Sequence, residues 1–271
     1  MDQLSSDRVL LLIEDGIAHV RLNRPDKLNA LDREMIAALI ETGEHLRDQP
    51  DVCAVIIAGV GKAFCSGLDL AEMASLADGT SAASDEMVQR SHGDANAFQR
   101  ISLIWRDLPV PVIAAVHGVC FGGGLQIACG ADIRVVDPEA RMSAMETAWG
   151  IVPDMGGFVL WPTMMRDDAM REIVFTAREF SGEEGALLGL VTHLADDPLM
   201  RAERLARMIA RRSPDAVRAA KRLANTASAG ASRREMLEAE TAEQEKLIGT
   251  PDQREAVAAR LAGREPLFSK R

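Results

Sequence analysis

Tyrosine is absent from this 271-residue chain, and aromatic residues make up only 4% of it. Without tyrosine, the chain cannot be a dehydrogenase that works through a tyrosine–lysine pair. Cysteine is also scarce: the four cysteines (Cys53, Cys65, Cys120 and Cys129) form no CxxC pair, so we expect neither a zinc ribbon nor a disulfide framework. The five histidines show no ligand spacing, so we interpret His117 as a turn or core residue and expect no metal site.

An excess of basic residues and a long apolar run are missing as well. The formal charge is −10 and the isoelectric point is about 5.1, so the chain has no general attraction for nucleic acid or an anionic membrane. An anionic ligand would therefore need a local cationic pocket. No apolar run approaches the roughly 18 residues of a membrane span, and the first residues, MDQLSSDRVLL, do not resemble a signal peptide. We expect a cytoplasmic protein.

Hydrophobic patterning predicts a mixed α/β fold. Residues 9–13 and 17–22 flank Asp15-Gly16 and predict a β-hairpin. Asp32 is placed to cap a helix whose apolar residues fall largely on one face. Continuous apolar runs predict further buried strands, and the helices between them favour a mostly parallel sheet. The expected strands are residues 52–58, 112–116 and 133–136, the last of which contains Arg134.

Two other stretches depart from this pattern. Residues 74–96 are small, polar and weakly periodic, which predicts a mobile loop near whatever site exists. From Pro198 onward the chain is expected to be entirely helical, and such a tail often packs on another surface, its own or a partner's. The expected helices cover residues 199–212, 215–228, 233–248 and 252–262.

Several familiar motifs fail at one residue each. A phosphate-binding P-loop needs a lysine after its last glycine, but Leu125 follows Gly124. A dinucleotide-binding fingerprint beginning at Gly59 would need a third glycine where Phe64 stands. The same Phe64 lies two residues before Ser66, where a nucleophile elbow requires glycine.

Two glycine-rich segments remain, GKAFCSGLDL at 61–70 and HGVCFGGGLQIACGAD at 117–132. Each lies at an expected strand-to-helix turn, where backbone N–H groups are left unpaired. Two such donors directed at one point form an oxyanion hole. Either segment alone is more typical of a tight turn that binds nothing, whereas the two together favour a binding site.

Six stretches in order along the chain carry a family resemblance: 20–31 (VRLNRPDKLNAL), 61–70, 111–135, 146–157 (ETAWGIVPDMGG), 181–191 and 264–271. They resemble the crotonase family, also called the enoyl-CoA hydratase/isomerase superfamily. The resemblance implies a spiral of ββα units over residues 1–197 and a helical region over 198–271 that forms a trimer, sometimes paired into a hexamer. It also implies an acyl-coenzyme A thioester as substrate and no permanently bound cofactor.

The resemblance further implies where the thioester binds. Its carbonyl would accept hydrogen bonds from the N–H groups of Leu68 and Gly123, and a β-carbon on Gly123 would push the thioester away. Coenzyme A would lie along two segments of this chain and a C-terminal segment of a neighbouring subunit. The implied binding residues are Lys27, Leu28, Ala30, Ala63, Ser66, Gly67, Asp69, Leu70, Gly122, Phe268 and Lys270. Lys27 is equally well explained as a solvated lysine.

The carboxylates depart from the pattern of family hydratases, which carry two glutamates. Here the first position is Gln126, which cannot exchange a proton, and the second is Glu146. Asp154 follows eight residues later, a spacing similar to that of family dienoyl-CoA isomerases. We expect Glu146 and Asp154 to share the site, where two nearby carboxylates push their pKa values apart. The alternatives are a turn aspartate at 154 and a structural, backbone-bonded glutamine at 126.

This residue set favours an enoyl-CoA or dienoyl-CoA isomerase in which Glu146 is the base. An enoyl-CoA hydratase, with Gln126 weakly orienting the water, is the alternative. A non-catalytic interaction protein is a further alternative, since some family members bind RNA. The negative charge and the retained Glu146 speak against it.

Overall fold

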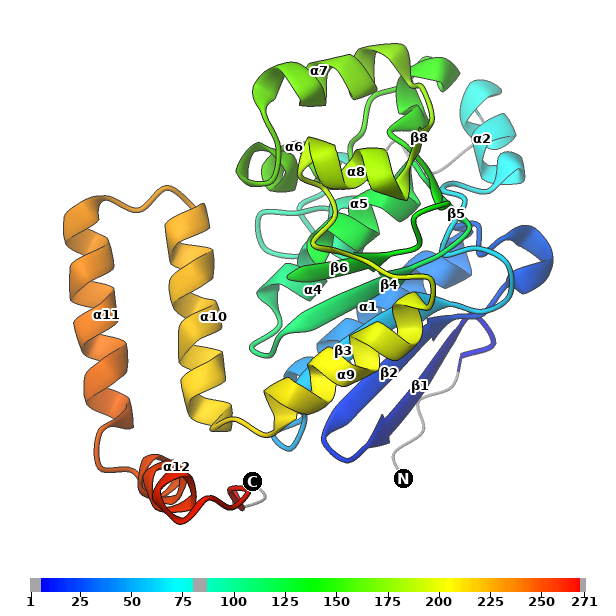
Figure 1. Cartoon of the computed structure of the whole chain (residues 1–271). Helices are drawn as coiled ribbons and strands as arrows, with labels where there is room; N and C mark the ends of the chain where they lie inside the picture. Colours follow the sequence, from blue (N-terminus) through cyan, green and yellow to red (C-terminus); the bar gives the residue numbers. More distant parts are fainter. Residues whose placement is uncertain (1–5, 80–86, 269–271) are drawn as a thin grey trace.

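The computed structural model describes residues 6–79 and 87–268, and it begins with a hairpin (Figure 1). Strands β1 (Val9–Glu14) and β2 (Ile17–Leu22) pair antiparallel, with Leu11 opposite Val20. The turn between them has positive φ at both Asp15 and Gly16, as a tight two-residue hairpin requires. The predicted hairpin is confirmed.

The main sheet has six strands in the order β1-β2-β3-β4-β6-β9. From β2 onward, each neighbouring pair is parallel, so the prediction of a mostly parallel sheet is confirmed. Its remaining strands are β3 (Ala54–Gly59), β4 (Val112–Val116), β6 (Ile133–Val136) and β9 (His193–Leu194).

Both faces of this sheet are covered, which explains why β3 is apolar at every position. On one face, Val55 and Ile57 join the large core formed with α1 (Arg33–Arg47), α4 (Ala97–Asp107) and α5 (Gly123–Gly130). On the other face, alanine, isoleucine and valine residues of the strands meet Ala202 and Ala206 of α9 (Pro198–Ala210). In Figure 1, α9 lies across this face of the strands.

A second, three-stranded sheet contains β5 (Val119–Phe121), β7 (Arg141–Ser143) and β8 (Phe180–Ser181). Its first strand, β5, follows β4 closely along the chain, and helix α5 begins just after β5 ends. Short elements connect the rest of the core: η1 (Pro25–Lys27), η2 (Met145–Trp149), α6 (Gly157–Leu160), η3 (Trp161–Thr163), α7 (Asp167–Thr176) and α8 (Gly182–Leu188).

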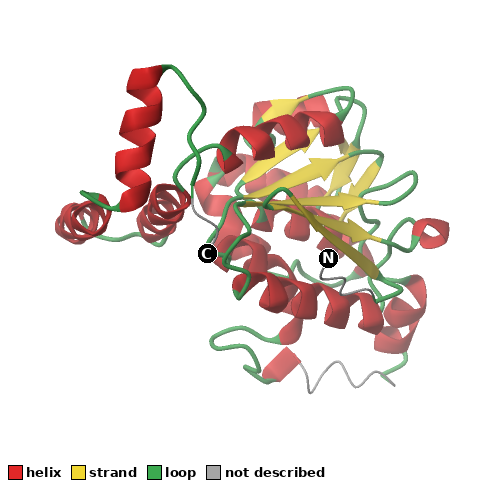
Figure 2. Ribbon diagram, turned by 90° about the horizontal axis from the view of Figure 1, so that it is seen from below, coloured by secondary structure: helices red, strands yellow, loops and turns green. Residues whose placement is uncertain are grey.

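The C-terminal region continues as α10 (Pro214–Ser228), α11 (Arg233–Leu247) and α12 (Pro251–Ala262). All four helices expected after Pro198 are present, with ends within two residues of the prediction. A buried lysine ties α10 to the core: Lys221 Nζ donates to the Trp105 and Val110 carbonyls and to the Asp132 carboxylate. Helices α11 and α12 project from the body (Figures 1 and 2).

The expected loop over 74–96 differs from the structure at its start. Helix α2 (Leu70–Ala77), capped by Asp69, continues through Ala74–Ala77 because alanine and leucine favour helix despite their weak periodicity. Residues 80–86 lie outside the described residues. Across residues 6–79 and 87–268, no helix is long and apolar enough to cross a membrane.

Candidate active site

Two turns that are far apart in the sequence meet at the edge of the core. An isolated parallel bridge joins Cys65 to Cys120, and a second joins Leu31 to Leu68. The N–H of Leu31 donates to the Gly67 carbonyl, and the N–H of Asp69 donates to the Leu31 carbonyl. Since successive peptide groups of an extended segment point to opposite sides, the Leu68 N–H points away from Leu31.

The second donor predicted from the sequence is the N–H of Gly123. Gly123 is the first residue of α5, so its N–H has no helical carbonyl to bond. A β-carbon built on Gly67 would lie 3.6 Å from the Gly123 nitrogen, which measures how closely the two turns approach. Among the described residues, neither Leu68 nor Gly123 donates its N–H to a protein acceptor.

The three consecutive glycines are required for three different reasons. At Gly122, where φ is +50°, a β-carbon would lie 3.1 Å from Oε1 of Glu146. At Gly124 a β-carbon would lie 2.4 Å from the Cys65 carbonyl oxygen. At Gly123 it would lie 2.6 Å from Met155 Sδ and 2.8 Å from Leu31 Cδ1, so two side chains already limit the space there.

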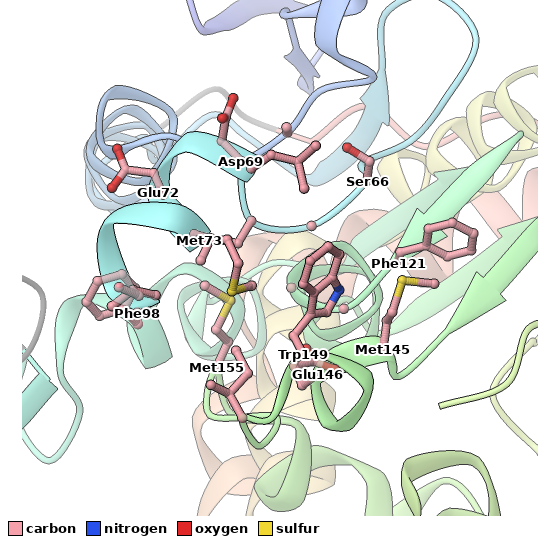
Figure 3. Close-up of a pocket in the computed structure, with 18 of the residues that line it drawn as sticks. Ser66, Asp69, Glu72, Met73, Phe98, Phe121, Met145, Glu146, Trp149 and Met155 are labelled. Carbon is pink, nitrogen blue, oxygen red and sulfur yellow. The ribbon is translucent and has the colours of Figure 1, made fainter. Parts of the chain in front are cut away.

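These turns open into a cavity of about 920 Å³. Figure 3 shows side chains from α2, from η2 and from the segment after η2 around it. Most of the binding and catalytic residues predicted from the sequence line it. They are Lys27, Leu28, Ala30, Ser66, Gly67, Leu68, Asp69, Leu70, Gly122, Gly123, Glu146 and Asp154.

Three predicted site residues that the structure describes are not part of this lining. Ala63 is fully buried, and its carbonyl accepts from the Asn29 side chain. Gln126 is fully buried behind the cavity. Phe268 lies at the end of the C-terminal region, outside the lining. Lys270 lies outside the described residues.

Asp69 lines the cavity, but its carboxylate already has partners. It accepts from the Ala71 N–H as the cap of α2 and pairs with Arg24. The bond from Ala71, followed by the bond from Arg24, lowers the pKa of Asp69. Figure 3 shows this carboxylate directed away from the centre of the cavity, so Asp69 shapes the wall and remains ionised.

Glu146 lies in η2 and is 8% exposed. Its Oε1 accepts a hydrogen bond of 2.7 Å from Nε2 of Gln126. Its Oε2 is buried and has no hydrogen-bond partner among the described residues. Burial raises the pKa of Glu146, the backbone N–H of Glu146 itself and then the Gln126 bond oppose this rise, and the charge of Asp154 adds to it.

Asp154 follows η2 on a loop that returns to the same cavity. Gly150 and Gly156, both with positive φ, allow the chain to turn before and after it. Burial raises the pKa of Asp154 as well. Two carboxyl groups with raised pKa values therefore line one cavity beside two free N–H donors, an arrangement suited to moving protons at a carbon next to a carbonyl.

The apolar wall of the cavity was not predicted. It contains four methionines and three aromatic residues from separate segments: Met73, Met87, Met145, Met155, Phe98, Phe121 and Trp149. Figure 3 shows Met73 of α2, Met155 and Trp149 extending toward the middle of the cavity. No motif marks these positions, although Met73 and Leu76 have the spacing of one helix face. Thioether side chains are flexible and accommodate varied apolar shapes.

No cluster of three or more metal-ligating side chains occurs in the part of the chain that the structure describes. The cavity instead offers backbone donors, two carboxyl groups and an apolar wall. Positive charge at its opening comes from Lys27 and Arg33, and Arg33 lies 3.7 Å from Glu72 of α2.

Comparison with known proteins identifies the family. The enoyl-CoA hydratase/isomerase family model matches residues 12–271. The chain is 34% identical over 221 residues to human mitochondrial enoyl-CoA hydratase domain-containing protein 2, covering 79% of this chain and 72% of that protein. It is 33% identical over 220 residues to mouse mitochondrial Delta(3,5)-Delta(2,4)-dienoyl-CoA isomerase, covering 76% of this chain and 64% of that protein.

A solved structure agrees over almost the whole length. The enoyl-CoA hydratase of Bacillus anthracis superposes with a TM-score of 0.87 at 26% identity, covering 97% of this chain and 100% of that one. The mixed α/β architecture is thus the crotonase fold expected from the sequence. The chain belongs to the enoyl-CoA hydratase/isomerase family.

Proposed function

We propose that this protein is an enoyl-CoA or dienoyl-CoA isomerase in which Glu146 is the base and Asp154 the second carboxyl group. One observation carries the proposal: Glu146 and Asp154 line the same cavity next to the free N–H groups of Leu68 and Gly123. At the position of the other hydratase glutamate, Gln126 is buried and bonded to protein groups. The resemblance to the mouse dienoyl-CoA isomerase also supports it.

The proposed reaction consists of two proton transfers. Glu146 takes a proton from the carbon next to the thioester carbonyl, and the electron pair of that C–H bond forms an enolate. The enolate oxygen accepts hydrogen bonds from the N–H groups of Leu68 and Gly123, and these groups need not move to form them. Asp154, whose neutral form is favoured by its raised pKa, returns a proton farther along the acyl chain. A double bond moves, no water is added, and a proton passing from Glu146 to Asp154 restores the starting state.

Coenzyme A binding is proposed along the opening of the cavity. Lys27 is exposed there, with Leu28, Ala30, Ser66 and Leu70 beside it. The backbone around Ala63 and Ser66 would form another part of the wall at the adenine end, and Gly67 and Gly122 would face the thioester end.

The oligomeric state is part of the proposal. We infer a trimer or a dimer of trimers in which residues 198–271 contribute to the interface and residues 1–197 form the acyl-CoA-binding core. Phe268 and Lys270 of one subunit would then contact the coenzyme A of its neighbour. Equilibrium sedimentation of the purified protein tests this, and a monomer at micromolar concentration would contradict it.

The decisive test is a panel of 2-enoyl-, 3-enoyl- and 3,5-dienoyl-CoA thioesters, with each product identified by mass and chromatographic retention. Isomerisation leaves the mass unchanged, whereas hydration adds one water. We expect products of unchanged mass from the 3-enoyl or dienoyl substrates. Hydration of a 2-enoyl-CoA as the best reaction would establish the hydratase alternative, and no turnover of any thioester would favour a binding protein.

A further inference from the structure

The side-chain amide of Gln126 connects three segments around the proposed base. Its Oε1 accepts two backbone hydrogen bonds of 2.9 Å, from Met155 and from Gly157. Its Nε2 donates to Oε1 of Glu146 at 2.7 Å. These bonds link α5 to η2 and to the loop that carries Asp154.

The orientation of this amide is determined by its partners. Only the amide oxygen can accept the hydrogen bonds that the Met155 and Gly157 N–H groups donate, so the NH₂ group must face Glu146. An NH₂ group cannot accept a proton. Oε1 of Glu146 therefore remains an acceptor whether Glu146 is ionised or neutral, since a proton on Oε1 would meet the amide hydrogen.

The other oxygen of Glu146 is in the opposite situation. Oε2 is buried and has no hydrogen-bond partner among the described residues, although Glu146 lines the cavity. A buried carboxylate oxygen without a partner is costly and calls for an explanation. A proton on Oε2, or a substrate that delivers one, would relieve it.

We propose that Gln126 is a positioning residue that keeps Glu146 Oε1 as a permanent acceptor, so that Oε2 alone exchanges protons with the substrate. This inference rests on the proposed function in one respect, the role of Glu146 as base. In the forward step the substrate C–H proton goes to Oε2 and the C–H electron pair goes to the enolate. Gln126 gains and loses no proton and does not touch the substrate.

The surrounding charges define what a titration should detect. The charged side chains that line the same cavity are Asp26, Lys27, Arg33, Asp69, Glu72 and Asp154. Of these, Asp154 is the one whose charge raises the pKa of Glu146. The Gln126 bond acts in the opposite direction because it favours the ionised form, so removing it should raise that pKa.

Two substitutions separate the donor from the acceptor of this amide. In Q126M the side chain has a similar length but neither donor nor acceptor. Glu146 Oε1 therefore loses its hydrogen bond, and the Met155 and Gly157 N–H groups lose their acceptor. Q126E retains an acceptor for those two N–H groups but places a second carboxyl group against Glu146 Oε1. The matched control is Q99M: the amide of Gln99 closes the capping box of α4 by bonding to Asn96, and among the described residues it forms no hydrogen bond with Glu146.

The measurement is an infrared difference titration of the substrate-free protein, following the carboxylic-acid carbonyl band with the E146Q protein as baseline. It reports the pKa of Glu146 without any turnover. We expect Q126M to raise the midpoint by about one pH unit, the value of one hydrogen bond to a charged group. Q126E should raise it at least as far, because two adjacent carboxyl groups share a proton. Q99M should leave the midpoint unchanged.

Kinetics supply the second measurement. In Q126M and Q126E, the acidic limb of kcat/KM should move upward in pH with the infrared midpoint. We expect the infrared midpoint to move by about one pH unit. If it stays within about 0.3 pH units of the wild-type midpoint in both variants, the inference is overturned. If Q126M does not fold, Q126E, which retains both loop bonds, decides. Loss of the base assignment is a separate result: an active E146Q protein would refute the proposed function, whereas the infrared shift would still test the Gln126 contact.

Discussion

Replacing Glu146 with glutamine tests the proposed chemistry most directly. The new side chain has nearly the same volume, and its amide oxygen can keep the bond from Gln126 Nε2. What disappears is the proposed function of Oε2, which is to accept and hold a proton. General acid–base catalysis contributes about 10²–10⁴-fold to rate, so kcat of E146Q should fall by at least that factor.

Whereas turnover falls, the stability of the folded E146Q protein at pH 7 should not fall. Burial raises the pKa of Glu146 from its ordinary value of 4.5, so the folded protein holds this proton more tightly than the unfolded chain. Between the unfolded and folded pKa values the stability therefore falls as pH rises, and at neutral pH the buried charge is a burden. E146Q removes that charge. Its melting temperature at pH 7 should be equal to or above that of the wild type.

The assay follows the best substrate of the thioester panel by product mass, and calorimetry with an unreactive saturated acyl-CoA measures binding. In the wild type, kcat/KM should rise with pH through a pKa above 4.5, since the base must be ionised. In E146Q this dependence should vanish while the dissociation constant stays within about threefold. Retention of more than about a tenth of the wild-type activity would refute the assignment of Glu146 as base.

Three further outcomes are expected. D154N should lower turnover by at least about 10²-fold and move the pH–rate profile. Its melting temperature at pH 7 should be unchanged or higher, because burial raises the pKa of Asp154. A loss of about 1 kcal/mol in the free energy of unfolding with unaltered kinetics would make Asp154 a turn cap. G123A should lose about 1–3 kcal/mol of stability and most of its turnover, because the new β-carbon meets Met155 and Leu31 and would displace the start of α5; normal kcat in the folded variant would mean that Met155 and Leu31 give way without moving the Gly123 N–H. K221M should lose about 3 kcal/mol in urea unfolding, because it leaves Asp132 without its buried partner; unchanged stability would mean that α10 is not held by this contact.

The strands and long helices could be predicted because each has a signal within its own sequence. Residues 112–116 are an uninterrupted apolar run and residues 133–136 are apolar except for Arg134, and they form β4 and β6 with the same bounds. The strands β8 and β9 contain two residues each, which is too short for any periodicity to identify. Their pairing depends on neighbours supplied by distant parts of the chain.

The site divides in a similar way. Leu68, Gly123 and Glu146 could be located from motifs, since each belongs to a contiguous stretch similar to the family pattern. The apolar wall could not, because Met73, Met87 and Met155 come from three segments that meet only after folding. Gln126 was identified as a departure from the hydratase pattern. Its bonds to Met155 and Gly157 depend on the path of a loop that no motif specifies.

The two kinds of group in this site differ in how they can change. The N–H groups of Leu68 and Gly123 belong to the backbone, and their positions follow from the bridge between Leu31 and Leu68 and from the start of α5. Almost any side chain at 68 leaves that donor in place. The carboxyl groups are side chains, so a single substitution adds or removes one.

Gln126 illustrates the consequence. A glutamine at this position cannot exchange a proton, yet its amide forms three hydrogen bonds that join the proposed base to the Asp154 loop. A carboxylate there would keep the loop bonds but lose the neutral donor that faces Glu146 Oε1. The same position can therefore supply a second acid or hold the first in place, and it cannot do both. On an unchanged pair of backbone donors, that choice separates a site with two glutamates from one that pairs Glu146 with Asp154.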